Sequence, residues 1–166
     1  MDPVNLNDLV EAIEQTVSSD TLSAWIDRRN GKICIFDTEI LGMVEDTDDE
    51  NIDYSNYPEW QHEEIREAIN FLEQWDGKTY VALPDKYEIH EYDIMEKFGE
   101  IQSNPHKANS ILSAIRGKGA FRRFRDAVDK LGITDEWYAY RDCEIQNMVR
   151  SWCKYNDIKY TEPEEV

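Results

Sequence analysis

Apolar residues near the start of the chain recur at intervals of three and four, which places them on one face of a helix. Asn5 precedes them, and its side-chain carbonyl can accept a hydrogen bond from a free backbone N–H. The pattern therefore predicts a helix over residues 6–17 with Asn5 as its N-terminal cap. The apolar positions of this helix are Leu6, Leu9, Val10, Ile13 and Val17.

Runs of β-branched and aromatic residues over 21–27 and 32–36 then predict two strands. Asn30-Gly31 lies between them, and such a pair favours a β-hairpin with a two-residue loop in which both residues take positive φ. Residues 79–83, which Pro84 follows, have the composition of a third strand.

The rest of the chain has helical periodicity. One helix begins near Pro58, which suits a first helical turn, and Asp76-Gly77 stops it. Thr134 is placed to cap a long last helix. The apolar stripes, helix by helix, are Ile65, Ala68, Ile69, Leu72 and Trp75; Ile89, Tyr92, Met95 and Phe98; Ala108, Ile111, Leu112 and Ile115; Phe121, Phe124, Val128 and Leu131; and Trp137, Tyr138, Ile145, Met148, Val149 and Trp152.

These elements describe an α+β protein, in which the hairpin and the third strand form a small antiparallel sheet packed against about six helices, with a helix-rich C-terminal half. A chain of 166 residues is long enough to bury a core, and we predict a single domain over residues 1–166. Residues 45–53 are almost all acidic or polar, which predicts an acidic surface loop near 45–57.

The charge of the chain narrows the choice of partner. There are 36 Asp and Glu against 18 Lys and Arg, a net charge of −18. Residues 1–100 carry a net charge of −19, whereas residues 101–166 carry +1. The acidic part repels a phosphate backbone at long range, so we expect no tight binding of duplex nucleic acid.

The three cysteines, Cys34, Cys143 and Cys153, lie outside metal-ligand spacings, and an odd number argues against a disulfide framework. This usage is typical of reduced thiols in a cytoplasmic protein. We see no signal peptide, and no apolar run approaches the roughly 20 residues of a membrane span. We therefore predict a cytoplasmic location and no membrane contact.

The sequence lacks a recognisable metal or cofactor motif. Asp46, Asp48 and Glu50 alternate as calcium ligands do, but Asn51 replaces the turn glycine of such a loop and Tyr57 its closing carboxylate. Neither a hydrolase serine elbow nor a glycine-rich dinucleotide loop is present. We predict no metal, no cofactor and no catalytic residue. The histidines, which are outside zinc-ligand spacings, are His62, His90 and His106.

One dense basic segment, residues 116–125, lies just before and within a predicted helix. Gly117 and Gly119 free the backbone near the helix start, where N–H groups and Lys118 could hold a phosphate or carboxylate. On the balance of charge alone we favour the alternative, in which the two phenylalanines of the segment are core and its arginines pair with the protein's own acidic part. The candidate anion- or partner-binding residues are Arg116, Gly117, Lys118, Gly119, Arg122, Arg123 and Arg125.

A second cluster falls within about two turns of the last helix. Its two carboxylates, phenol and guanidinium could carry acid–base chemistry. They could equally form a helix start whose aromatic residues pack and whose arginine bonds a neighbouring carboxylate. We favour the structural role, because no nucleophile or cofactor motif accompanies the cluster. Its members are Asp135, Tyr138, Arg141 and Asp142.

Several of these motifs resemble those of a bacterial family. They are Gly117-x-Gly-Ala-Phe-Arg-Arg-Phe-Arg-Asp126, Trp137-Tyr138-x-Tyr-Arg-Asp142 and Trp152, together with the hairpin, the acidic stretch and the segment 92–98. The family is uncharacterised protein family 0158, and the resemblance covers most of the chain, most closely over residues 87–158. It implies a bacterial cytosolic protein and brings no activity, cofactor or catalytic residue with it.

We therefore predict a non-enzymatic binding or regulatory protein. Its contact surface would be the basic helix start at 116–125, with the acidic N-terminal half as a second, oppositely charged face. We expect the partner to be another protein, with a small anion as an alternative ligand. Two other functions stay open: an enzyme that uses the cluster at 135–142 on a phosphate held near Lys118, and an acidic decoy of a nucleic-acid-binding protein.

Overall fold

A computed structural model of the chain describes residues 3–47 and 51–163 and has the predicted α+β architecture. The chain divides into two compact units, one of residues 1–86 and 149–166 and the other of residues 87–148. The single domain over residues 1–166 stays a prediction.

The first unit contains a three-stranded antiparallel sheet in the order β3-β2-β4. Trp25 in the central strand pairs with Cys34 on one side and with Ala82 on the other. Side chains alternate across a sheet, so Trp25 and Asp27 share one face and Ile26 lies on the opposite face. The three strands, all predicted from the sequence, are β2 (Leu22–Asp27), β3 (Ile33–Asp37) and β4 (Tyr80–Ala82).

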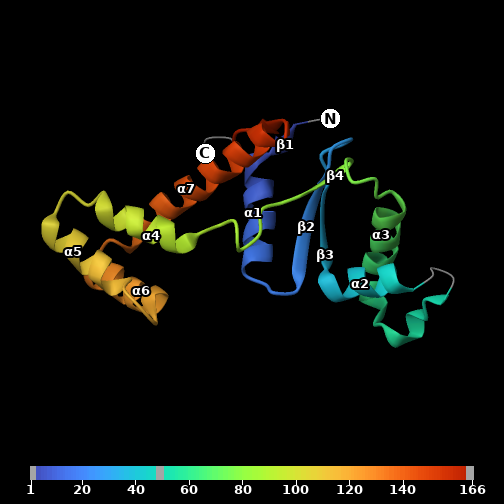
Figure 1. Cartoon of the computed structure of the whole chain (residues 1–166), viewed down its shortest axis with the longest axis horizontal. Coiled ribbons are helices and arrows are strands. Elements are labelled where there is room, and N and C mark those ends of the chain that lie inside the picture. Colours follow the sequence, from blue (N-terminus) through green and yellow to red (C-terminus); the bar gives the residue numbers. More distant parts are fainter. Residues whose placement is uncertain (1–2, 48–50, 164–166) are drawn as a thin grey trace. The chain divides into compact units, whose positions relative to one another are not determined.

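Helices cover both faces of this sheet (Figure 1). Helix α1 (Leu6–Val17), which Asn5 caps as predicted, lies on the face that carries Ile26. Helices α2 (Thr38–Asp46) and α3 (His62–Glu73) pack on the other face around Phe36. The remaining elements of the unit are two 3-10 turns, η2 (Tyr54–Asn56) and η3 (Glu59–Gln61), and a short parallel pair, β1 (Val4–Asn5) with β5 (Tyr160–Thr161).

The hairpin between β2 and β3 has a longer loop than the sequence predicts. Its loop is residues 28–32, and within it the N–H of Gly31 donates to the carbonyl of Asp27 at 2.7 Å. Gly31 has a φ of 79°, but Asn30 does not take a positive φ. The side chain of Asn30 accepts from the N–H of Lys32 at 2.8 Å instead. The two-residue loop was therefore wrong, because side-chain bonds to the loop backbone compete with the tight turn.

The acidic stretch after the hairpin is not a loop throughout. Helix α2, which the sequence analysis missed, extends to Asp46. Its buried face is only Ile40 and Val44, too few positions for a clear helical period. Residues 48–50 lie outside the described residues, and Ile52 beyond them is 9% exposed and belongs to the core around Phe36. The predicted surface loop near 45–57 is thus wrong at both of these places.

Helix α3 buries a different aromatic residue from the predicted one. The helix ends at Glu73, so Trp75 lies beyond it and is 44% exposed. Phe71 takes the central place, at 4% exposure, with its ring 5.5 Å from that of Trp25 and 5.0 Å from that of Phe36. The prediction that Trp75 completes the buried stripe was wrong, because Trp75 lies beyond the helix end and its ring, 5.0 Å from that of Trp25, lies at the exposed edge of the aromatic core.

The second unit is helical and has its own aromatic core. The ring of Phe98 in α4 lies 5.3 Å from that of Trp137 and 5.4 Å from that of Tyr140, both in α7. Gly99 lets α5 approach closely, since a Cβ added there would lie 2.9 Å from side-chain atoms of Ile111 and Leu112. The helices are α4 (Glu91–Glu100), α5 (Pro105–Ala114), α6 (Ala120–Lys130) and α7 (Thr134–Tyr155), whose residues from 149 onward belong to the first unit.

Three aromatic residues that the sequence places in this core lie on its surface, and the first of them is Tyr92 in α4, which is 38% exposed. Helix α6 buries Ala120, Phe124 and Val128, at intervals of four, and this leaves Phe121 at the edge with 52% exposure. Tyr138 follows the buried Trp137 by one position, about 100° around the helix, and is 51% exposed. No helix within the described ranges has both the length and the apolar character to cross a membrane.

We expect Phe71→Ala to lower the free energy of unfolding by about 3 to 5 kcal/mol, since it removes a buried ring from the core of the sheet. Trp60→Ala is the control in the same unit, because Trp60 is 73% exposed and its loss should cost less than about 1 kcal/mol. Chemical denaturation measures both, and equal losses would contradict the assigned core.

Candidate functional site

The predicted anion loop, residues 116–119, joins α5 to α6 in the second unit. Gly117 and Gly119 both have a φ of 75°, a left-handed conformation that a residue with a side chain resists. Helix α6 begins at Ala120, and Gly119 at its cap position offers no side-chain hydrogen bond. The glycines are therefore required by the turn itself, whether or not an anion binds there.

Arg123 turns back onto this loop and bonds its carbonyls. Its Nε donates to the carbonyl of Ala114 at 2.9 Å and its Nη2 to that of Gly117 at 3.3 Å. The guanidinium also bonds the carbonyls of Arg116 and Lys118. Carbonyls at a helix C-terminus have no intrahelical donor, so Arg123 caps α5 with a favourable charge. Its donors are used inside the protein, with backbone carbonyls rather than carboxylates as acceptors.

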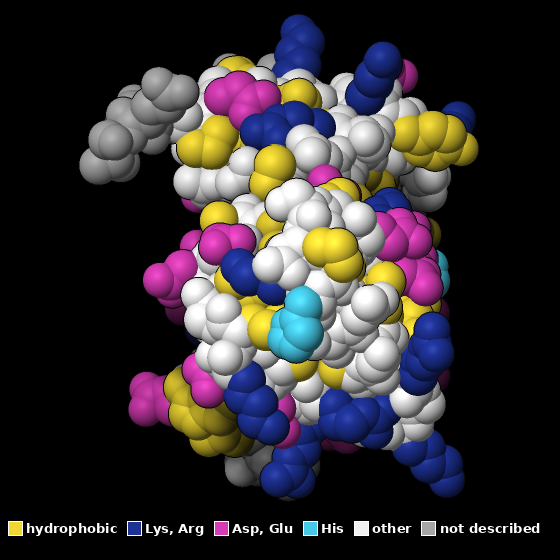
Figure 2. All heavy atoms as spheres, turned by 90° about the vertical axis from the view of Figure 1, so that its left-hand side faces the viewer, with side chains coloured by type: hydrophobic (Ala, Val, Ile, Leu, Met, Phe, Trp, Pro, Cys, Tyr) yellow, Lys and Arg dark blue, Asp and Glu magenta, His cyan; other side chains and the backbone are white. Residues whose placement is uncertain are grey.

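The other basic side chains of the segment point into solvent. In Figure 2, Lys and Arg side chains gather along the lower edge of the face that is shown. Arg116, Lys118, Arg122 and Arg125 are exposed, and none forms an ion pair with any residue in the described ranges. The expected pairing of these arginines with the acidic part of the chain is therefore not seen there.

The two predicted clusters meet at one small hollow of about 120 Å³, which we call the aromatic hollow. Arg125 from the basic segment lines it together with Tyr138 and Arg141 from the second cluster. Lys118, Asp135 and Asp142 are not among its lining residues. Its other walls are Glu91, Met95, Phe121, Phe124 and Trp137.

The walls of the aromatic hollow are fixed, while its rim is open. Phe124 and Trp137 are buried, with ring centroids 4.6 Å apart, and form the apolar floor. Arg141 Nε donates to Glu91 Oε1 at 2.8 Å, which holds both side chains in place. Phe121 and Tyr138 stand exposed at the rim beside Arg125. Of the lining residues, the sequence analysis names only Arg125, Tyr138 and Arg141 as candidate site residues. Their grouping was not predictable, because α6 and α7 meet only through packing.

The chemistry of the aromatic hollow favours binding over a reaction. Its one carboxylate, on Glu91, is already paired with Arg141. Burial raises the pKa of the Cys153 thiol to about 11 and raises that of Cys34 above its ordinary value, so neither of these two thiols is a ready nucleophile. Among the described residues, no three or more His, Cys, Asp or Glu side chains group as metal ligands would.

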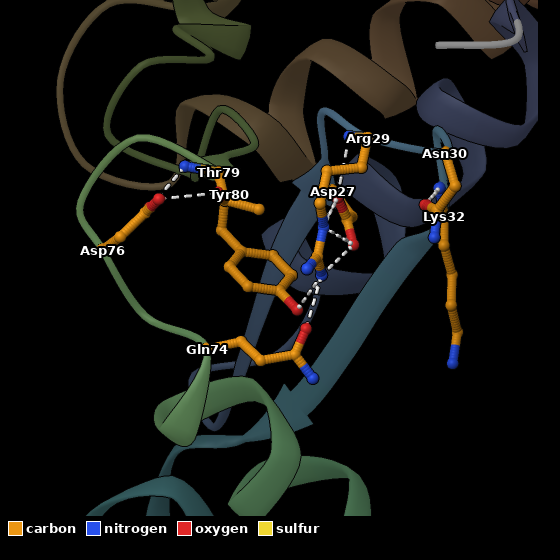
Figure 3. Close-up of polar contacts among 8 residues, drawn as sticks. All are labelled: Asp27, Arg29, Asn30, Lys32, Gln74, Asp76, Thr79 and Tyr80. Carbon is orange, nitrogen blue, oxygen red and sulfur yellow. Dashed lines mark hydrogen bonds and ion pairs between the residues drawn. The ribbon is translucent and has the colours of Figure 1, made fainter.

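A second hollow, which the sequence analysis missed, lies in the first unit (Figure 3). At its centre, Asp27 is 4% exposed and holds Arg29: Nε donates to Asp27 Oδ1 at 3.0 Å and Nη2 to Asp27 Oδ2 at 2.7 Å. The same Nη2 donates to Gln74 Oε1 at 2.7 Å and to the Tyr80 hydroxyl at 3.1 Å. Hydrogen bonds from Arg29 hold the pKa of Asp27 below its usual value.

This polar hollow has a volume of about 420 Å³. Asp76 fixes the turn that precedes Tyr80 by accepting from the N–H groups of Lys78 and Thr79, and these bonds lower the pKa of Asp76 to about 2. No motif marks the hollow, because its residues come from the hairpin loop, α3 and β4. The polar side chains that line it are Asp27, Arg29, Asn30, Lys32, Glu67, Asn70, Gln74 and Tyr80.

Comparison of the chain with family models, with curated proteins and with solved structures finds no match. The resemblance to uncharacterised protein family 0158 and the bacterial origin that it implies therefore stay predictions from the motifs.

We expect Arg123→Met to lower the free energy of unfolding by about 1 to 2 kcal/mol, because the carbonyls at the end of α5 lose a charged donor. Arg122→Met is the matched control one position away, where no such bond is lost. Urea denaturation of the two variants compares them directly. Equal stability of both would show that the cap contributes nothing.

Stability should also depend on pH through Asp27. Its pKa is lowered in the folded protein, so the bonds to Arg29 stabilise the fold above the ordinary value of 3.8 and are lost as the pH falls through the lower folded value. We expect the free energy of unfolding to fall less steeply below about pH 4 in Asp27→Asn than in the wild type. Denaturation at several pH values measures this, and an equal slope of the free energy of unfolding against pH in the two proteins would contradict the prediction.

Proposed function

We propose that this protein binds an acidic segment of another protein at the aromatic hollow and acts by binding rather than by catalysis. The observation that carries the proposal is the exposure of Phe121 and Tyr138 beside Arg125, around a buried aromatic floor. Aromatic residues and arginine dominate the binding energy of protein interfaces, since they bury large areas and form directed hydrogen bonds.

The charge around the hollow specifies the partner. Residues 105–134 carry seven Lys and Arg against two Asp and Glu, whereas the rest of the chain is strongly acidic. Charges act over about 8 Å at physiological salt, so a ligand at the hollow responds mainly to the charges of its walls, where Arg125 forms no ion pair with a described residue and Arg141 is paired with Glu91. An acidic segment with one apolar side chain would place that side chain on the floor and a carboxylate near Arg125.

The acidic first unit limits the partner further. Residues 1–86 and 149–166 carry 25 Asp and Glu against nine Lys and Arg. Such a charge repels every polyanion at long range, so an acidic segment that binds must be short and must be held by local contacts at the hollow. The enzyme and the acidic decoy stay predictions, and neither gains support from the hollow.

The test is fluorescence anisotropy with a labelled acidic peptide that contains a single central Leu. We expect Phe121→Ala and Arg125→Met each to weaken binding by about tenfold or more, as for loss of a central interface residue. Arg122→Met, on the same helix but outside the hollow, should change the affinity by less than about threefold, as for a charge at the rim.

A peptide with Gln in place of each acidic residue is the second control and should bind at least about tenfold more weakly. Equal losses for Arg125→Met and Arg122→Met would show that only the general positive charge attracts the peptide. In that case the hollow is not the site.

A further inference from the structure

Arg29 in the polar hollow is held in a fixed position with part of its guanidinium left open. Asp27, Gln74 and Tyr80 bond its Nε and Nη2, and the guanidinium carbon lies 5.6 Å from the centre of the Tyr80 ring. Its Nη1 makes no hydrogen bond with any residue that the structure describes, and the side chain is 52% exposed. An arginine that is already oriented loses little entropy when it binds an oxyanion.

Lys32 and Glu67 form a second pair of charges in the same hollow. Lys32 Nζ lies 2.8 Å from Glu67 Oε1, and both side chains are more than half exposed. An exposed ion pair with a single contact contributes little free energy, so a ligand can compete for either partner. Glu67 Oε2 accepts no hydrogen bond from the described residues and is open to a donor.

Only some of the polar residues that line this hollow are needed to hold the fold together. The bonds among Asp27, Arg29, Gln74 and Tyr80 tie the hairpin loop to α3 and β4, which is a structural task. The charges of Lys32 and Glu67 are not needed for it. Asn70 also lines the hollow, and its side-chain amide bonds to no residue in the described ranges.

The charges of the hollow decide which ligand it suits. Asp27 and Glu67 balance Arg29 and Lys32, so the ionised lining is neutral as a whole. Burial raises the pKa of both Cys34 and Tyr80, which keeps these groups uncharged near neutral pH. A multiply charged anion would find no excess positive charge here and would be repelled by a chain of net charge −18. A ligand that carries one charge of each sign matches the lining.

We propose that the polar hollow binds a small zwitterion of the amino-acid class. Its carboxylate bonds the open edge of Arg29, its ammonium group bonds Glu67, and its side chain lies toward the ring of Phe71. The volume of about 420 Å³ is within the usual range for small-molecule sites, roughly 300 to 1,000 Å³. This site is independent of the aromatic hollow.

The test titrates the full chain, labelled with nitrogen-15, with each of the common amino acids in turn. We expect at least one to bind with a Kd below about 1 mM and to shift the amide signals of residues 28–32 and of Asn70 to Gln74. Its N-acetyl derivative, which lacks the ammonium group, and its decarboxylated amine should each bind at least about tenfold more weakly.

Two conservative variants separate a binding site from a structural network. Glu67→Gln keeps the size of the side chain and should weaken the binding of the amino acid by about tenfold. The affinity for the N-acetyl derivative should stay the same or increase, because the substitution releases Lys32 from its ion pair. Arg28→Lys, next to Arg29 but outside the hollow, should change the affinity less than about twofold. The proposal is overturned if no amino acid shifts these signals, if the N-acetyl derivative binds equally well, or if Glu67→Gln binds like the wild type.

Discussion

The fold of the first unit depends on how one buried carboxylate obtains its hydrogen bonds and its charge partner. Asp27 ends the central strand on the face that α2 and α3 cover, and at 4% exposure it has lost its hydration. A buried charge without a partner is costly, so Arg29 must stay beside it. Because Arg29 also bonds Gln74 and Tyr80, the same requirement fixes the hairpin loop, the end of α3 and the start of β4. The polar hollow exists because these three segments are held together.

The second unit divides its arginines between structure and surface. Arg123 satisfies the carbonyls at the end of α5, Arg141 pairs with Glu91, and Arg125 remains open. Residues of one type, within one short stretch of sequence, therefore have different roles that only their contacts reveal. The same holds for the two phenylalanines of α6, since Phe124 is part of the core and Phe121 is half exposed.

Local patterns predicted most of the fold. The cap at Asn5, the three strands and the helices of the second unit each depend on neighbours in the sequence, and all are present. Features that depend on distant partners were not predictable. Arg29 reaches Gln74 and Tyr80 across 45 and 51 positions, which no periodicity records. Helix α2 was missed because its short apolar face runs into the acidic stretch.

Gly99 shows how a packing requirement can resemble a functional one. A methyl group at this position would lie 2.9 Å from side chains of α5, closer than such atoms approach in folded proteins, so the side chains of Ile111 and Leu112 or the helices themselves would have to shift. During evolution, the exposed side chains of the second unit can change while this position stays glycine. An invariant glycine among relatives of this protein would thus record the distance between two helix axes and would carry no information about a ligand.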